Sequence, residues 1–275
     1  MEYYDIEHEP FYMITSPAGY KYYQIDIRNV EIERLQKIID ACEAVERACW
    51  DAQEPFHNYF KERDLLTYIV KDGQLIAFQL LSYWTFERYV AFGFDETMVL
   101  KEHRGYNLGF ALCTVSARTL YLIFSKKKGA KFTFLSITPN PGVMLGYFRY
   151  RYLLSIMVNT FKPSPDLMKI HDKYLEKKNH SLVHKDYPFI IKNMFPGSLS
   201  SFKTKPFPPK LKKMIPDDAN FFERGDAFAF MAIFSKYTCW PGITLMMFRF
   251  FGKEYVTNKN MGIFASGGKI TLSEA

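Results

Sequence analysis

The sequence predicts an α/β (α+β) fold in which helices flank a central sheet, with a long C-terminal extension after the core. Residues 65–101 contain a hairpin pattern followed by a third strand-like run, and segments with helical spacing lie on both sides, at residues 30–50 and 105–125. The chain has 275 residues, of which 48% are hydrophobic, so it can bury one large core or a core with an appendage.

The first predicted elements are a short strand at Tyr22–Ile27 and a helix at Val30–Trp50. Within the second segment, apolar residues from Ile32 to Val45 recur at the spacing of one helix face. Asn29 precedes that face, so we expect it to cap the helix.

A hairpin follows. The β-rich runs Leu65–Val70 and Gln74–Ser82 are joined by residues 71–73, which contain the Asp-Gly pair typical of tight hairpin turns. A third strand is predicted at Tyr89–Lys101. These three runs should form an antiparallel meander.

The core continues with a helix, a strand and a second helix. The helix at Gly105–Ser125 is followed by three lysines and Gly129, which is typical of a helix end. Phe132–Thr138 is apolar along most of its length, as in a central strand. The turn at Pro139–Gly142 then begins a helix that is predicted to reach about Val158.

We expect residues 1–160 to form the core and residues 161–275 a C-terminal region. Its predicted elements are a helix at Pro165–Lys178, an extended Pro/Lys-rich connection at Phe195–Asp218, a strand at Ala227–Phe234, and a strand or short helix at Ile243–Phe251. If the strand at Ala227–Phe234 joins the sheet, the residues before it are an insertion within one domain.

Charge and composition limit the partners. The net charge of +7 and a pI near 9.0 favour anionic ones: nucleotide phosphates, an acidic carrier protein, nucleic acid or a membrane surface. Aromatic residues make up 17% of the chain, which fits either a ring-packed core or a groove for a long apolar group. The basic Pro-rich segment matches no nucleic-acid-binding motif, so specific nucleic-acid binding is the least favoured of these.

Cysteine usage and the N-terminus predict a cytoplasmic protein with free thiols and without a metal or a permanent cofactor. The first residues lack the basic head and apolar run of a signal peptide, and no stretch reaches about 18 apolar residues. Metal-ligand spacing is absent from the cysteines and from a histidine cluster that we expect on the surface: Cys42, Cys49, Cys113 and Cys239, and His171, His180 and His184.

The most informative stretch is Arg104-Gly105-Tyr106-Asn107-Leu108-Gly109, where a predicted strand runs into a helix. The first backbone N–H groups of a helix have no intrahelical partners and lie at the positive end of its dipole, so such a turn can hold a phosphate. Arg104 adds a positive charge, and the glycines let a ligand approach the backbone closely. We therefore predict a phosphate-binding loop at residues 104–109.

This loop resembles the pyrophosphate loop of the GNAT superfamily of N-acyltransferases, Arg/Gln-x-x-Gly-x-Gly/Ala. Arg104 and Gly109 match its first and last fixed positions. Asn107 replaces the middle glycine, and asparagine tolerates the left-handed backbone conformation better than most residues.

The order of the elements is also similar over roughly residues 20–160. A meander precedes the loop, a helix and a strand follow it, and Tyr147 lies seven residues after Asn140, as in the family pattern. Arg151 stands where the family usually has a glycine. The resemblance implies a GNAT-like mixed, mostly antiparallel central sheet flanked by helices.

The resemblance also implies a ligand site within that sheet. The strands before and after the loop would splay apart and admit pantetheine, whose amides would bind backbone groups of Met98, Val99 and Leu100. One of those N–H groups would polarise the thioester carbonyl. The pyrophosphate would lie on residues 104–109. Asn140 would also contact the bound acyl-CoA.

The implied reaction is direct attack of an amine on the thioester of acyl-CoA, the co-substrate. The amine must lose a proton, for which Asp95 or Glu96 would be the base, and Tyr147 would protonate the departing thiolate. The acyl group would be acetyl or a longer fatty acyl, and the acceptor a small amine, an amino acid or a peptide lysine. The C-terminal region would shape the acceptor site.

Two alternatives stay open. In the first alternative, the acyl donor is an acyl carrier protein. In the other, the chain is a binding module that keeps the fold and has lost the chemistry, which the departures at Asn107 and Arg151 motivate.

Overall fold

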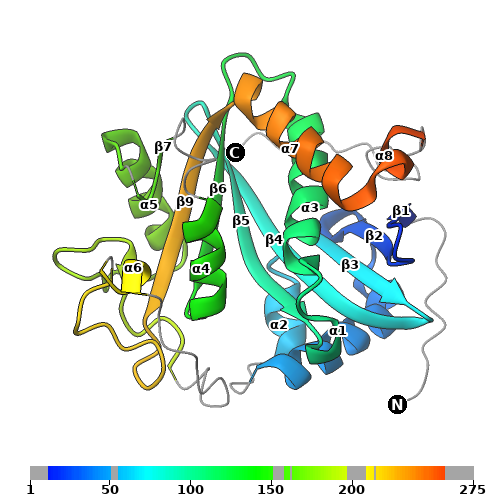
Figure 1. Cartoon of the computed structure of the whole chain (residues 1–275), viewed down its shortest axis with the longest axis horizontal. Coiled ribbons are helices and arrows are strands. Elements are labelled where there is room, and N and C mark those ends of the chain that lie inside the picture. Colours follow the sequence, from blue (N-terminus) through cyan, green and yellow to red (C-terminus); the bar gives the residue numbers. More distant parts are fainter. Residues whose placement is uncertain are drawn as a thin grey trace.

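The computed structural model describes residues 12–50, 55–150, 158–161, 163–196, 209–213 and 215–257. These residues form one nine-stranded sheet with helices on both faces (Figure 1). Its strands are β1 (Tyr12–Thr15), β2 (Lys21–Asp26), β3 (Leu65–Lys71), β4 (Gln74–Phe86), β5 (Tyr89–Val99), β6 (Lys131–Thr138), β7 (Val158–Asn159), β8 (Ile190–Ile191) and β9 (Ala227–Ser235). The helices are α1 (Gln36–Cys49), α2 (Phe56–Phe60), α3 (Leu108–Phe124), α4 (Pro141–Tyr150), α5 (Pro165–Lys177), α6 (Pro209–Lys212), α7 (Lys236–Phe251) and α8 (Lys253–Thr257).

The sheet is mixed and mostly antiparallel, as predicted. Its strand order is β1-β2-β3-β4-β5-β6-β9-β7, with β8 paired to β9. The β5–β6 pair is parallel, and the other pairs of named strands are antiparallel. The crossover between the parallel strands contains α3, the helix that follows the predicted phosphate loop.

The predicted meander is confirmed. Asp72 and Gly73 have φ values of 51° and 77°, the positive angles of the hairpin turn that matches strand twist. That turn pairs Lys71 with Gln74 and fixes the β3–β4 register.

The C-terminal strand predicted at Ala227–Phe234 is present as β9 and lies inside the sheet. It pairs with β6 along its whole length, from Thr138 opposite Phe228 to Lys131 opposite Ser235. Both faces of β9 are buried, which explains its continuous apolar run. The central sheet therefore includes a strand from the C-terminal region.

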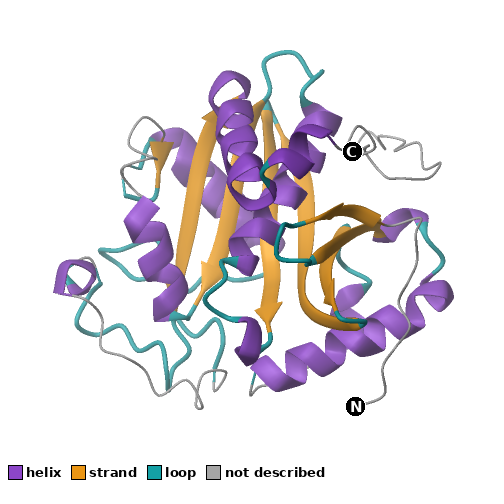
Figure 2. Ribbon diagram, turned by 45° about the vertical axis from the view of Figure 1, so that its right-hand side comes forward, coloured by secondary structure: helices purple, strands orange, loops and turns teal. Residues whose placement is uncertain are grey.

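Helices cover both faces of the sheet (Figure 2). Side chains alternate along β9, so Ala229 and Met231 pack on the side of α5 while Phe228 and Phe230 pack on the side of α3, α4 and α7. Further along the sheet, α1 and α2 cover the α5 side. We call these the α1/α5 face and the α3/α7 face.

Several predicted elements have different bounds. Ile243–Phe251 is the second half of helix α7 and not a strand. The helix predicted from Val30 begins as a 3-10 turn at Ile32–Leu35 before α1, and Glu31, not Asn29, precedes that turn. Asn29 instead donates to Asp26.

The helix predicted to reach Val158 is α4, and Val158 itself lies in β7. Residues 151–157, including Arg151, lie outside the described residues. The sequence did not predict β1, β7, β8, α2, α6 or α8. Of the extended connection predicted at Phe195–Asp218, residues 197–208 and 214 lie outside the described residues. Among the described residues, no helix is long and apolar enough to cross a membrane.

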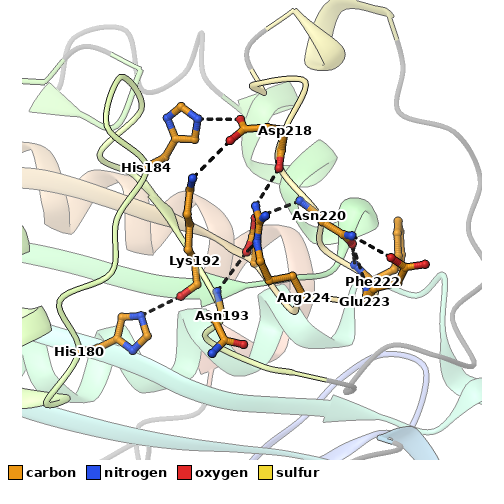
Figure 3. Close-up of polar contacts among 10 residues, drawn as sticks. His180, His184, Lys192, Asn193, Asp218, Asn220, Phe222, Glu223 and Arg224 are labelled. Carbon is orange, nitrogen blue, oxygen red and sulfur yellow. Dashed lines mark hydrogen bonds and ion pairs between the residues drawn. The ribbon is translucent and has the colours of Figure 1, made fainter.

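Of the three histidines predicted on the surface, His171 and His184 are buried and His180 is partly exposed. His171, on α5, is 1% exposed, and burial lowers its pKa. His184 is buried too, and its Nε2 donates to Asp218 because its Nδ1 accepts the N–H of Asp186. His180 contacts the carbonyl of Lys192 (Figure 3). The contacts of His180 and His184 hold the loops before β9 together, which gives these two side chains a structural role.

A chain of buried hydrogen bonds joins α3 to four strands. Thr119 donates to Gln24, whose amide donates to Thr67, and Thr67 bonds Ser116 at 2.8 Å. Ser116 then donates to Gln79, and the amide of Gln79 donates to Thr97 at 3.0 Å. Because the chain crosses β2, β3, β4 and β5, it fixes α3 relative to the far end of β5.

We predict that Thr67→Val lowers the free energy of unfolding by about 1–3 kcal/mol, because the change keeps the shape and leaves the Gln24 amide without its acceptor. Thr85→Val is the matched control, since Thr85 is exposed on β4, and it should change stability by less than about 0.5 kcal/mol. Urea denaturation measures both. Equal effects of the two substitutions would contradict a stabilising role for the chain.

Candidate active site

The strands β5 and β6 part halfway along the sheet. They pair from Tyr89 opposite Lys131 to Phe94 opposite Ser136. Beyond Phe94, β5 continues to Val99 with β4 as its partner, while Ile137 and Thr138 of β6 pair with β9. A gap in the hydrogen-bonded ladder therefore opens in the middle of the sheet, between residues 95–99 and the end of β6.

The register identifies the backbone groups that face this gap. The N–H of Leu100 donates to the carbonyl of Ile76 on β4, at 3.0 Å. Since hydrogen-bonded residues alternate in an antiparallel ladder, Met98 also faces β4, and the amide groups of Thr97 and Val99 point the other way. Of the three predicted backbone contacts, Val99 faces the gap. Thr97 is a further candidate that the sequence analysis did not name.

The predicted phosphate loop lies directly after β5. Lys101–His103 forms a 3-10 turn, Gly105 has φ 94°, and Asn107 has φ 59° and ψ 24°, which is left-handed. Asn107 is the residue before α3, and its carbonyl accepts the N–H of Ala111. The substitution of asparagine for glycine thus falls where the backbone needs a residue that tolerates positive φ.

The loop is exposed and attached to β5. Arg104 is exposed, and its Nε donates to the carbonyl of Val99 at 2.9 Å. The Cys49 thiol of α1 donates to the same carbonyl at 3.3 Å. Tyr106 is 63% exposed. The first N–H groups of α3, which have no partner within the helix, thus lie beside a cation at the end of β5.

A bulge in β5 decides where the predicted bases point. Leu80 of β4 pairs with Glu96 and Leu81 pairs with Phe94, so Asp95 is an extra residue. Asp95 and Glu96 both contact Arg63, although neighbouring residues in a regular strand point to opposite faces. The bulge therefore brings two carboxylates together on the α1/α5 face.

The two carboxylates have different surroundings. Asp95 is 3% exposed and accepts from Lys178 at 2.7 Å and from Ser82 at 2.6 Å, with Arg63 at 3.3 Å. Since Lys178 directly follows α5, this contact fastens the C-terminal region to the bulge. Asp95 is thus fully engaged in buried ion pairs.

Glu96 forms its ion pair with Arg63, is affected by the charge of Lys178 as well, and has more contact with solvent than Asp95. Its side chain is 19% exposed, and both oxygens accept from the Arg63 guanidinium, at 2.9 and 3.2 Å. Burial and the neighbouring charge of Asp95 raise the pKa of Glu96, and Arg63 opposes that rise. Glu96 is therefore the more accessible of the two carboxylates, with 19% of its side chain exposed against 3% for Asp95.

Tyr147 lies on the other face of the sheet. Its ring stacks on Phe230 of β9 with centroids 4.2 Å apart, and Phe110 of α3 packs edge-on against it. Burial raises the pKa of Tyr147, and a hydrogen bond with Ser136 partly offsets that rise. Ser136 is the last β6 residue paired with β5, so the Tyr147 hydroxyl lies where the gap begins.

Asn140 begins helix α4. Its Oδ1 accepts the N–H of Gly142 at 2.8 Å, and its carbonyl accepts from Val143 and Met144. It follows β6 across the gap from the phosphate loop. The structure thus gives Asn140 a capping contact, and its predicted contact with a cofactor stays a prediction.

The structure gathers the predicted residues around one gap, on two faces. Tyr147 and the loop at the start of α3 lie on the α3/α7 face, and Asp95 and Glu96 lie on the α1/α5 face. Sequence reasoning missed Arg63, Ser82 and Lys178, because each is far from the carboxylates along the chain. Among the described residues, no cluster of three or more His, Cys, Asp or Glu has the geometry of a metal site.

Neither a protein-family model nor a curated protein matches the sequence. Similar solved structures include an acyl-CoA N-acyltransferase from Pseudomonas aeruginosa, with 15% identity, 48% of this chain and 87% of that chain covered, and a TM-score of 0.35. The ribosomal-protein-S18-alanine N-acetyltransferase from Escherichia coli has 13% identity, 78% and 94% coverage, and a TM-score of 0.38.

A GNAT family acetyltransferase from Elizabethkingia anophelis with acetyl-CoA bound has 12% identity, 77% and 96% coverage, and a TM-score of 0.34. At such identities and TM-scores these similarities carry no argument about the chemistry of this chain. Its fold is defined by the observed strand order, which has the meander, parallel crossover and parted strands that the GNAT resemblance predicts.

A further, partly buried carboxylate, Asp64, pairs with Arg28 at 3.6 Å and accepts the N–H of Tyr83 at 2.7 Å. Burial raises the pKa of Asp64 to about 6, against an opposing effect of Arg28. The folded state therefore holds this proton more tightly than the unfolded chain. That contribution to stability is full below about pH 4 and is lost as the pH rises through about 6.

We predict that Asp64→Asn changes stability in a pH-dependent way. We compare the free energy of unfolding of the variant minus that of the wild type at each pH. This difference should be about 1–2 kcal/mol more positive at pH 7 than at pH 4, because only the wild type then buries a charged carboxylate. Chemical denaturation at both pH values measures this. The exposed Asp217→Asn should show no such difference. If the difference in free energy of unfolding between the wild type and Asp64→Asn is the same at both pH values, Asp64 does not titrate as stated.

Proposed function

We propose that the chain is an N-acyltransferase that moves an acyl group from acyl-CoA to an amine. The observation that carries the proposal is the gap between β5 and β6, with a phosphate-type loop at one end, a tyrosine on one face and a carboxylate pair on the other. A transfer reaction needs these three parts in one place: a donor site, an acid for the leaving group and a base for the acceptor.

The gap suits pantetheine because it offers strand-like hydrogen bonds. An extended ligand that lies along residues 97–99 would pair with the outward backbone groups of Thr97 and with the N–H of Val99, as an added strand does, while the Val99 carbonyl already accepts from Arg104 and Cys49. The pyrophosphate would then meet the N-terminus of α3 and Arg104, which follow β5 directly. A backbone N–H at this edge would polarise the thioester carbonyl.

The chemistry assigns one face to each reactant. A neutral amine approaches from the α1/α5 face and attacks the thioester carbon, forming the N–C bond as the C–S bond breaks. Its proton passes to Glu96, whose raised pKa makes it a better base than an ordinary glutamate. Tyr147, on the α3/α7 face beside Ser136, protonates the departing thiolate.

One observation favours a second candidate, a binding module without chemistry. Both carboxylates are paired with cations: Arg63 contacts Asp95 and Glu96, and Lys178 contacts Asp95. A base held in a bidentate ion pair must leave or share that contact to accept a proton. In this second candidate CoA binds and no transfer follows.

We predict that CoA raises the melting temperature of the protein. A hundredfold excess over the dissociation constant stabilises by about 2.7 kcal/mol. Asn107→Gly should keep this shift, because glycine adopts positive φ freely. Asn107→Val should lose most of it, because a β-branched residue disfavours that backbone. The absence of a shift in the wild type, or equal shifts in both variants, would contradict the donor site.

The same titration with acetyl-CoA and longer acyl-CoAs addresses chain length. A shift that grows with the chain supports a fatty acyl donor held among the aromatic side chains. Equal shifts place recognition in the CoA moiety. Among the described residues, no contact singles out a carrier protein, so the donor is proposed as acyl-CoA.

We further predict different outcomes for the two carboxylates. Glu96→Gln should lower kcat by about 10²–10⁴-fold and keep the CoA-induced thermal shift. Asp95→Asn should mainly lower stability, because it removes the buried negative charge that faces Lys178, while Arg63 keeps its pair with Glu96. The assay is thiol release from acetyl-CoA across a panel of amines and amino acids. Full activity of Glu96→Gln would remove Glu96 from the role of base.

A further inference from the structure

Exposed apolar side chains concentrate on the α3/α7 face. The large hydrophobic residues that are more than a third exposed include three on α7: Tyr237 at 78%, Leu245 at 66% and Phe248 at 56%. They lie at i, i+8 and i+11 along the helix, and the exposed Pro241 fills the i+4 position. These four residues form one apolar stripe, which we call the α7 stripe.

The stripe is not the face by which α7 packs on the protein. The buried positions of α7 are Cys239, Ile243, Met247 and Phe251, which follow a second line along the helix. That line joins the core with α3, and Trp240 stacks on Tyr121 of α3. Helix α7 is therefore apolar on its outward side as well as its inward side, which is unusual for a surface helix.

Charge on helix α7 itself has one sign, and the next acid along the chain is the exposed Glu254 of α8. Helix α7 carries Lys236 and Arg249 and no acidic residue. The turn before β6 adds the exposed Lys126, Lys127 and Lys128, and it lies beside the start of α7 because Lys131 pairs with Ser235 and the Tyr121 hydroxyl contacts the carbonyl of Lys236. Figure 1 shows this turn next to α7 at the top of the molecule.

The asymmetry extends over α3, α4 and α7, whereas the short helix α8 of the same layer carries the exposed Glu254. Residues 103–165 and 227–253 contain no Asp or Glu, and they supply α3, α4 and α7. On the opposite face, α1 and α5 carry acidic residues: Asp40, Glu43 and Glu46, and Asp166, Asp172 and Glu176. One face of the sheet is thus apolar and cationic, and the other has mixed charge.

We propose that the α7 stripe docks on the surface of an anionic lipid bilayer. An apolar stripe flanked by lysines and arginine matches such a surface, because the side chains enter the acyl boundary while the cations meet the headgroups. The helix has 16 residues, fewer than the roughly 20 that span a bilayer, so it would lie on the membrane and not cross it.

Charge and apolar surface together favour a lipid bilayer over a second copy of the chain or a nucleic acid. A second copy docked through the same stripe would bring two sets of cations together without acids to balance them. Nucleic acid would meet the cations and leave Leu245 and Phe248 without an apolar partner. The proposal does not depend on acyl transfer.

Vesicle sedimentation of the full chain tests the proposal. Two kinds of vesicle are compared: pure phosphatidylcholine, and an equal mixture with phosphatidylglycerol. We expect the protein to pellet with the anionic vesicles and to stay in the supernatant with the neutral ones. Added salt should weaken the binding. A protein that stays in the supernatant with both would overturn the proposal.

Matched variants locate the surface. Phe248→Asp and Leu182→Asp each alter a side chain that is 56% exposed, and only the first lies on α7. Phe248→Asp should weaken binding more than about tenfold, and Leu182→Asp should not. Lys127→Gln should weaken it about fivefold, whereas Lys37→Gln on α1 should have no effect. Unchanged melting temperatures confirm that the variants fold.

Two results would overturn the assignment even if the protein pellets. One is equal binding by Phe248→Asp and Leu182→Asp. The other is a dimer in sedimentation equilibrium without vesicles that Phe248→Asp abolishes, because the stripe would then be an interface between copies of the chain.

Discussion

The arrangement of the site depends on one interruption in backbone hydrogen bonding, the point where β5 leaves β6. A strand inside a sheet normally has both edges paired, because an unpaired buried N–H or C=O costs as much as a lost hydrogen bond. Here β5 loses its β6 partner after Phe94 and keeps β4. In the proposed function, this edge at residues 97–99 is the template for an extended ligand, and the exposed loop at residues 104–109 begins where the edge ends.

Two features hold the gap open. The bulge at Asp95 changes the course of β5 at the place where pairing with β6 stops, and Arg63, Ser82 and Lys178 hold the bulged residue. On the other face, the hydrogen-bond chain from Thr119 to Thr97 fixes α3 over the strands. The loop and the open edge therefore keep their relative position without a ligand between them.

In the proposed reaction, the sheet separates a donor side from an acceptor side. Tyr147 is packed between aromatic rings on the face of α3, whereas the carboxylates lie among cations on the face of α5. Because Lys178 follows α5, the C-terminal region contributes directly to the acceptor side, beyond supplying β9.

Local signals in the sequence predicted the parts of the fold that local physics decides. The Asp72-Gly73 turn, the left-handed Asn107 before α3 and the apolar β6 and β9 each follow from a few adjacent residues. The bulge could not be predicted, since nothing in Phe94-Asp95-Glu96 marks an extra residue, and without it the two carboxylates would face opposite sides. Arg63 pairs with Glu96 across 33 positions, a contact that only the folded sheet creates. Helix α7 was ambiguous because it is apolar on both sides, so periodicity did not identify it.

Hydrogen exchange of the backbone amides along β5, measured with and without CoA, tests the central claim most directly. If pantetheine adds to the open edge, protection should rise at Thr97 and Val99, whose amides face the gap. It should change little at Met98 and Leu100, which already face β4. An alternating pattern of this kind is the result we predict. Uniform protection along residues 97–100, or no change at Thr97 and Val99 when CoA binds, would contradict a ligand site between β5 and β6.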